Sequence, residues 1–217
     1  MTMFGWKKET APRRMAETSA AADGGFVATR GLIAGTRIGT AMGWRPVEAL
    51  AAGDMVLTFD NGLQPLVDVR REVYWLSDRL PERDALVVVP AGAMGNTVDV
   101  ALPSDQGVLI ESEAACDAQG DPFAVVRAKH LDGFRGVHRA MPPVQMEVVT
   151  LVFANEEVIY AEGGILLHCA RMVMHLDDLV RAASGYEVLS AHDASFLVDC
   201  MAVEYAGGMT AASPMVA

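Results

Sequence analysis

Short apolar runs separated by turn residues dominate the chain from about residue 26 to residue 169. The runs are rich in Val, Ile, Leu and Thr and are interrupted by Gly, Pro and Asn-Gly, a pattern typical of many short strands. Strands are predicted at 36–40, 55–59, 66–76, 86–90, 107–112, 123–128, 146–154 and 157–164. The pattern therefore predicts an all-β fold.

Two turn signals suggest which strands pair. Asn61-Gly62 is a strong hairpin signal, so we expect 55–59 to pair with 66–76. The acidic turn Asn155-Glu156-Glu157 is expected to join 146–154 and 157–164 into a second hairpin.

Four regions are predicted along the chain: a loose tail at 1–23, a β domain at 24–169, helices at 170–205 and a tail at 206–217. The first helix is predicted from apolar residues at helical spacing, with Ser184-Gly185 as its end. These residues are Met172, Leu176, Leu179, Val180 and Ala183. Asp193 is expected to cap a second helix that carries Phe196, Leu197, Cys200 and Met201 on one face.

Composition limits the partners. The 217 residues include 28 acidic and 17 basic side chains, for a net charge of −11, which disfavours binding to nucleic acid. No run approaches the ~18 apolar residues of a membrane span, so we expect a soluble protein without a membrane partner. The first 23 residues lack the apolar region of a signal peptide. We expect a cytoplasmic protein unless a C-terminal signal directs export.

No residue pattern indicates a metal or cofactor. Cys116, Cys169 and Cys200 are far apart and form no CxxC, so we expect reduced thiols. The histidines His130, His138, His175 and His192 lack the i, i+4 spacing of a helical metal site. We therefore predict neither a bound metal nor a cofactor.

The most specific motif lies between residues 35 and 62. It reads G35-T36-x-I38-x-T40, then G43-x-R45-P46-V47-E48-x-L50-x-x-G53-D54-x-V56-x-T58, then D60-x-G62. This block resembles the opening of Hint domains, the fold shared by the Hedgehog autoprocessing domain and inteins, in the branch found in alphaproteobacteria. Weaker similarity to the second and third blocks of the family lies at 90–110 and 148–164.

The resemblance implies a horseshoe-like β body that cuts its own chain. In active members a cysteine at the N-terminal edge attacks the preceding carbonyl, and a second-block histidine protonates the leaving nitrogen. By its distance from Gly35-Thr36, the cysteine position falls at Gly31. The second-block histidine position falls at Gln106, and a further third-block histidine position falls at Glu156.

None of these three residues can perform the family's chemistry. Gly31 has no hydroxyl or thiol to activate. Gln106 has no proton to exchange near neutral pH, so the general-acid contribution of about 10² to 10⁴ in rate is lost. Glu156 cannot serve as a cation poised near neutrality. We therefore expect no catalytic residues and a fold that has lost its activity.

A threonine and a His-Cys pair are the two other candidates for chemistry. Thr29 is the nearest upstream hydroxyl, but on a strand it lies about 6.6 Å along the chain from Gly31. His168-Cys169 resembles the end of an intein without its asparagine, and we interpret it as structural.

Three hypotheses follow. The first is a degenerate Hint protein that acts as a binding or structural module for an unknown protein partner. The second is an active autoprocessing domain that uses a different nucleophile, for which Thr29 is the candidate. The third is an unrelated β-rich protein that binds a ligand or partner through its acidic surface.

Overall fold

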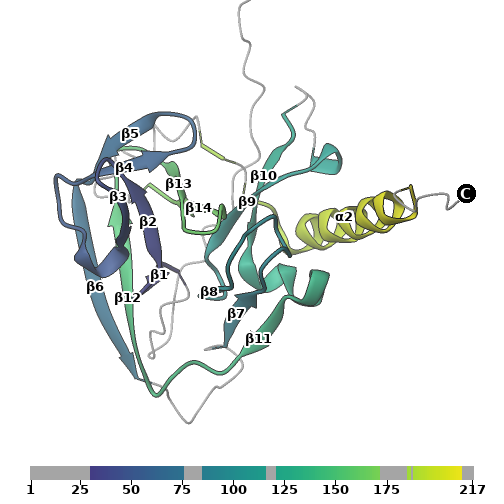
Figure 1. Cartoon of the computed structure of the whole chain (residues 1–217), viewed down its shortest axis with the longest axis horizontal. Helices are drawn as coiled ribbons and strands as arrows, with labels where there is room; N and C mark the ends of the chain where they lie inside the picture. The colour runs from purple at the N-terminus through teal and green to yellow at the C-terminus, as the bar shows by residue number, and fades with distance from the viewer. Residues whose placement is uncertain (1–29, 76–84, 116–120, 172–184, 187, 212–217) are drawn as a thin grey trace, which may run out of the picture.

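The computed structural model describes residues 30–75, 85–115, 121–171, 185–186 and 188–211. Within these ranges the chain forms three β-sheets and a C-terminal helix (Figure 1). The first sheet has three antiparallel strands in the order β1-β12-β6. Its strands are β1 (Leu32–Ile33), β12 (Gln145–Val152) and β6 (Asp68–Trp75). The fold is mostly β, as the apolar runs predict.

The second sheet is the largest, with eight strands in the order β10-β9-β14-β13-β4-β2-β3 and with β5 paired to β4. Its strands are β2 (Arg37–Thr40), β3 (Gly43–Pro46), β4 (Met55–Thr58), β5 (Gly62–Pro65), β9 (Gly107–Glu111), β10 (Phe123–Arg127), β13 (Glu157–Tyr160) and β14 (Leu166–Cys169). Strands far apart in sequence are neighbours here, so this sheet brings the three similarity blocks together.

The third sheet has the order β11-β7-β8. Its strands are β7 (Leu86–Val89), β8 (Val100–Leu102) and β11 (His138–Ala140). Short 3₁₀ turns connect the strands: η1 (Val47–Ala49), η2 (Glu113–Ala115), η3 (Ala128–Leu131) and η4 (Phe134–Gly136). The C-terminal helix α2 (Ala191–Ala211) packs against η2, η3 and η4.

One hydrophobic core joins the sheets. Its largest fully buried side chains come from several strands and turns, and include Ile38, Leu50, Leu102, Leu131, Ile159 and Leu167. Helix α2 contributes Ala194 and Leu197, which are 0% and 2% exposed. Because these residues are adjacent only in the folded chain, the core depends on long-range strand pairing.

Polar residues of the first motif hold its turns. Glu48 Oε2 accepts a hydrogen bond of 2.8 Å from the Gly35 backbone N–H. The Asp54 carboxylate accepts bonds from Arg45 Nη1 at 3.0 Å and from the Ala51 N–H at 2.9 Å. The motif residues therefore stabilise the scaffold, a role that needs no catalysis.

The first predicted hairpin is wrong in its second arm. Strand β4 pairs with β5, directly after the Asn61-Gly62 turn, and not with 66–76. The chain then leaves the sheet at Leu66, which is 2% exposed, and Val67 donates its N–H to Val152 O. As a result β6 pairs with β12 in a different sheet.

The second predicted hairpin is also wrong. Strand β12 pairs with β1 and β6, whereas β13 pairs with β14 and β4. Phe153, which is 5% exposed, turns into the core between the two strands and separates them into different sheets. Glu156 consequently faces β14 and not an exposed turn.

Helix α2 starts two residues before Asp193, and Ser190 caps it in place of Asp193. The Ser190 hydroxyl accepts a bond from the Asp193 N–H at 3.2 Å and donates to the Asp193 carboxylate at 2.7 Å. The Ser190 hydroxyl thus caps the third N–H of the helix, and the Asp193 carboxylate orients that hydroxyl. The helix reaches Ala211, within the range 206–217 expected to be a tail.

The helix predicted around Met172 to Ala183 lies outside the described residues. In the described ranges, no helix combines the length and the apolar character that crossing a bilayer requires.

Replacing Leu50 tests the importance of the common core. Leu50→Ala removes a fully buried side chain and should lower the free energy of unfolding by about 2 to 5 kcal/mol. Leu63→Ala, a matched control at a side chain that is 43% exposed, should cost less than about 1 kcal/mol. Urea denaturation followed by circular dichroism measures both, and equal losses would contradict a core centred on Leu50.

Candidate functional site

The residues at the three positions singled out from the sequence lie in one hydrogen-bonded network. The Gly31 N–H donates to Gln106 Oε1 at 3.0 Å. Gln106 in turn bonds to the backbone of His168, whose ring contacts the carboxylate of Glu156. Residues separated by as many as 137 positions in the sequence are therefore joined through a few contacts.

The register of the large sheet explains why these residues meet. Strand β14 lies between β9 and β13 and is antiparallel to both. His168 is opposite Gly107 on one side and Val158 on the other. Gln106 and Glu156, which immediately precede β9 and β13, therefore flank the same end of β14.

Gly107 allows these strands to approach closely. A Cβ atom at this position would lie 2.9 Å from His168 Cβ and 2.8 Å from Val125 Cγ1. Both distances are shorter than carbon atoms tolerate, so a larger residue would displace His168. The position of the His168 ring thus depends on a glycine in the neighbouring strand.

Both ends of the buried Gln106 side-chain amide form hydrogen bonds. The side chain is 4% exposed. Its Oε1 accepts from Gly31, while its Nε2 donates to His168 O at 2.8 Å and to Gly107 O at 3.0 Å. Two carbonyl acceptors on one side and one N–H donor on the other determine which end of the amide carries nitrogen. Gln106 is therefore an acceptor toward Gly31.

His168 and Glu156 form the polar half of the site. Nε2 of the His168 ring bonds Glu156 Oε1, and the other carboxylate oxygen accepts from the Tyr186 N–H at 3.1 Å. The rings of His168 and Tyr186 meet edge to face with centroids 6.2 Å apart. Across the described ranges, no three His, Cys, Asp or Glu side chains are placed to hold a metal ion.

Gly31 occupies a place that has no room for a side chain. Its φ is +114°, a conformation that residues with a Cβ rarely adopt. A Cβ atom would lie 2.6 Å from Val148 Cγ1 and 3.2 Å from Val149 O. A residue of any other type would therefore require both backbone and side-chain movement.

Three side chains are candidate nucleophiles: two threonine hydroxyls and the thiol of Cys169. Thr29 lies outside the described residues. Thr150 Oγ1 lies 3.3 Å from the position that a Gly31 Cβ would occupy, so it is a hydroxyl beside the site that sequence reasoning missed. Burial and, secondarily, the nearby Glu157 carboxylate raise the pKa of Cys169 to about 12. At neutral pH this thiol is protonated and is a poor nucleophile.

Sequence reasoning placed His168 in a structural pair and did not connect it to Gly31. A single histidine within a strand has no local spacing signal, and its relation to Gln106 arises only from strand pairing. The positions of Gly31 and Gln106, in contrast, follow from their distances to Gly35-Thr36 and to the apolar run Val108-Leu109-Ile110, and that of Glu156 follows from the similarity to the third block.

Comparison with known proteins gives one family match. The profile of the Hint domain family matches residues 30–166, which is more than half of the chain. No curated protein matches the sequence.

Several solved structures are similar to the chain. A splice-inactive variant of the AceL NrdHF class 3 split intein is 15% identical, with a TM-score of 0.40, covering 65% of this chain and 99% of that one. The gp41-1 intein is 12% identical, with a TM-score of 0.41 and coverages of 64% and 97%. A bacterial intein-like domain from Clostridium thermocellum is 16% identical, with a TM-score of 0.40 and coverages of 64% and 98%.

Replacing Gln106 tests the network directly. Gln106→Leu keeps the approximate shape but leaves the Gly31 N–H and two backbone carbonyls without their side-chain partner. Buried polar groups without partners should lower the free energy of unfolding by about 2 to 4 kcal/mol. Gln145→Leu, at an exposed position of β12, should change it by less than about 0.5 kcal/mol. A loss at Gln106 no larger than at Gln145 would mean that the bridge does not form.

Adding a methyl group tests whether Gly31 is enclosed. Gly31→Ala should cost about 2 to 4 kcal/mol, because backbone strain and the contact with Val148 act together. Gly92→Ala is the matched control, since Gly92 has a φ of +84° but no atom within 4 Å of an added Cβ. It should show the backbone cost alone, about 1 to 2 kcal/mol. Equal denaturation midpoints for the two variants would contradict the enclosure of Gly31.

Proposed function

Because this chain belongs to the Hint domain family, we propose that it has kept the family's scaffold, has lost self-cleavage and acts as a binding or structural module. Within the family, the motif over residues 35–62 is our basis for placing it in the alphaproteobacterial branch. Arg45, Glu48 and Asp54 of that motif hold turns, which is consistent with a scaffold retained for its shape.

The closed position at Gly31 carries this proposal. Self-cleavage needs a side-chain nucleophile within reach of the preceding carbonyl, and proximity effects are lost when reacting atoms are displaced by even 1 Å. Gly31 supplies no such group, and Val148 fills the space into which a thiol would extend. The surroundings have therefore adapted to glycine.

The direction of the Gln106 hydrogen bond supports the same conclusion. An acid that assists cleavage must deliver a proton to the leaving nitrogen. Gln106 Oε1 instead accepts the proton that the Gly31 nitrogen already carries. This contact holds the peptide in place and gives no assistance to breaking it.

The remaining proton-carrying groups are directed elsewhere. His168 presents its backbone carbonyl to Gln106 and its ring Nε2 to Glu156. Cys169 keeps its proton at neutral pH because burial raises its pKa to about 12. In our proposal both residues stabilise the end of β14 and take no part in bond cleavage.

The intact mass of the purified protein tests the loss of cleavage. After overnight incubation at pH 7 with dithiothreitol or with hydroxylamine, the full-length mass should remain, because no thioester or ester forms beside Gly31. Gly31→Cys should also stay intact, since the added thiol lacks both space and a proton donor at Gln106. A fragment ending at Ala28, which attack by Thr29 on the preceding carbonyl would give, or a fragment ending at Arg30, which attack by Thr150 would give, would overturn the proposal. The variants Thr29→Ala and Thr150→Val would then identify the hydroxyl responsible.

A further inference from the structure

One face of the large sheet is apolar and open to solvent over β2, β3, β4 and β5. Met55 and Leu57 alternate along β4 with buried side chains, so they point to the face away from the core. Leu63 of β5 is paired with Leu57. The side chains of Met55, Leu57 and Leu63 are 37%, 38% and 43% exposed. This part of the sheet lies at the end of the molecule remote from α2 (Figure 1).

Aromatic side chains extend this surface toward the middle of the sheet. Trp44, which is 46% exposed, lies over Gly39 of β2. A Cβ atom added there would lie 3.5 Å from Trp44 Cζ3, 3.6 Å from Leu57 Cβ and 3.7 Å from Tyr160 Cβ. The Tyr160 ring is 6.2 Å from the ring of Phe59. Contiguous exposed apolar surface of this kind marks interaction sites. We call the following set the apolar face: Trp44, Met55, Leu57, Phe59, Leu63 and Tyr160.

The rim of the apolar face is acidic beside Phe59. Asp60 follows Phe59 directly, and Asp121 comes two residues before Phe123. The rings of Phe59 and Phe123 meet edge to face with centroids 5.2 Å apart, which brings the two carboxylates to the same edge. Partial desolvation and, secondarily, the Asp121 carboxylate raise the pKa of Asp60. A ligand for this face should therefore combine apolar side chains with positive charge.

The chain carries a segment of this chemistry before Gly31. Residues 3–8 read Met-Phe-Gly-Trp-Lys-Lys, with two aromatic side chains directly before two lysines. Over residues 1–14, four basic side chains accompany one acidic side chain, whereas the whole chain has a net charge of −11. The field of the acidic domain therefore attracts this part of its own chain.

The segment can reach the apolar face. Gly39 lies at that face and follows Gly31 by eight residues, so the two are at most about 29 Å apart. Twenty-three residues separate Trp6 from Arg30, and a flexible chain of that length spans about 24 to 29 Å. At an effective concentration on the order of 1 mM, a contact with a Kd of about 0.1 mM is about nine-tenths occupied. A weak contact is therefore sufficient within one chain.

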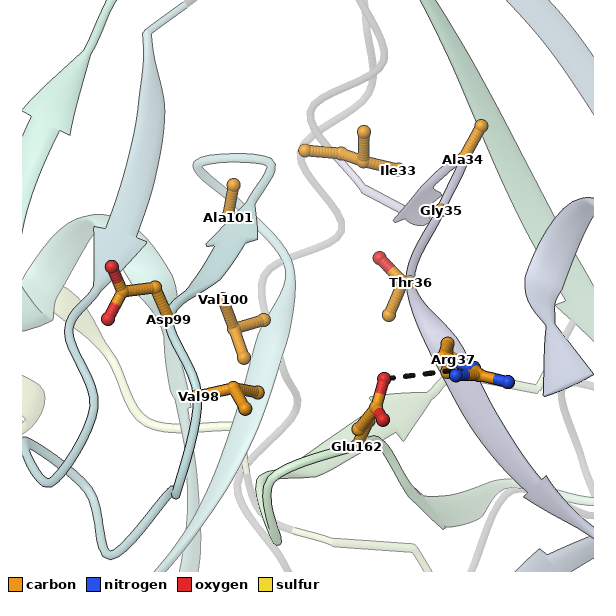
Figure 2. A pocket seen from close by; sticks show the side chains of 10 residues that line it. All are labelled: Ile33, Ala34, Gly35, Thr36, Arg37, Val98, Asp99, Val100, Ala101 and Glu162. Atoms are coloured by element: carbon orange, nitrogen blue, oxygen red, sulfur yellow. Dashed lines mark ion pairs between the residues drawn. The ribbon is translucent and has the colours of Figure 1, made fainter. Parts of the chain in front are cut away.

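A pocket of about 230 Å³ lies elsewhere, between β1 and β8 (Figure 2). Its volume is below the roughly 300 Å³ at which pockets for drug-sized ligands begin. Val100 in its wall is buried, and Arg37 is paired with Glu162 at 3.8 Å. Two aromatic side chains with their lysines therefore fit the open sheet face better than this pocket.

We propose that residues 3–8 fold back onto the apolar face, with the rings of Phe4 and Trp6 on its apolar side chains and the two lysines at its acidic rim. The contact is intramolecular, and no bond is made or broken. It assigns to the binding module an occupant from its own chain. The proposal rests on the proposed function in one respect, because self-cleavage beside Gly31 would release the segment from the domain.

NMR of the full-length protein tests the contact directly. Nuclear Overhauser effects (NOEs) should join the Trp6 indole to the methyl groups of Leu57 and Leu63. In a mixture of labelled and unlabelled chains, these NOEs should be absent between different chains. Phe4→Ser combined with Trp6→Ser should shift the backbone amides of the apolar face. Met15→Ser, which also removes an apolar side chain before Gly31, should leave them unchanged.

A separate peptide measures the affinity of the face. The probe is acetylated, amidated Met-Phe-Gly-Trp-Lys-Lys, and its control is Met-Ser-Gly-Ser-Lys-Lys. On the full-length Phe4→Ser, Trp6→Ser chain, the probe should bind with a Kd of about 0.1 mM, and the control should bind at least about tenfold more weakly. On the unaltered chain the probe should bind about tenfold more weakly, because the tethered segment already occupies the face.

Two charge changes test the acidic rim. In the Phe4→Ser, Trp6→Ser chain, Asp60→Lys should weaken binding of the probe by at least about fivefold. Asp199→Lys, the same change at an exposed position of α2, should alter it less than about twofold. Unfolding midpoints of all variants separate loss of binding from loss of structure.

The proposal fails if the NOEs are absent, if they arise between different chains, or if both peptides bind equally. It also fails if Met15→Ser shifts the apolar face as much as the double variant. The intact mass reports self-cleavage independently. A full-length chain without the NOEs would refute the contact and leave the loss of cleavage standing. A chain that cuts itself would refute the proposed function, whereas saturable binding of the probe would still support the contact.

Discussion

The side-chain amide of Gln106 is the contact on which the rest of the site depends. It joins the chain entering β1 to the end of β14 and to the start of β9, with three hydrogen bonds of 2.8 to 3.0 Å. Because the group is buried, its partners have no access to water as a substitute, and each bond is costly to lose. Gly31, Gly107 and His168 hold their relative positions through this single side chain.

The network continues from Gln106 toward the C-terminal part of the chain. The His168 ring bonds the Glu156 carboxylate, which in turn accepts a hydrogen bond from the Tyr186 backbone N–H. Further along, Arg135 lies over the Tyr205 ring of α2, 3.9 Å from its centroid, and Leu197 is buried beneath the helix. The same body that encloses Gly31 therefore also fixes the last helix.

Local sequence signals predicted the strands better than their partners. The apolar runs placed most strands of the large sheet within a few residues, because strand formation follows from alternation and turn residues. The strands that pair with 66–76 and 146–154 were not predictable from local sequence. Leu66 and Phe153 are buried in the core at the points where the chain crosses from one sheet to another. Motif distances point to Gly31 and Gln106, and similarity to the third block points to Glu156, but His168 joins them only through register with Gly107. The sequence pattern favoured Asp193 as the helix cap, but Ser190, three residues earlier, is the residue that caps the helix.

Amide hydrogen exchange at Gly31 tests the enclosure of this position most directly. An N–H that is buried and bonded to Gln106 exchanges only when the site opens, so we expect protection comparable to that of neighbouring core amides such as Val149. In Gln106→Leu the protection should fall at Gly31 more than at Val149. Exchange of the Gly31 amide at the rate of an unstructured peptide in the unaltered protein would contradict a closed, bridged site.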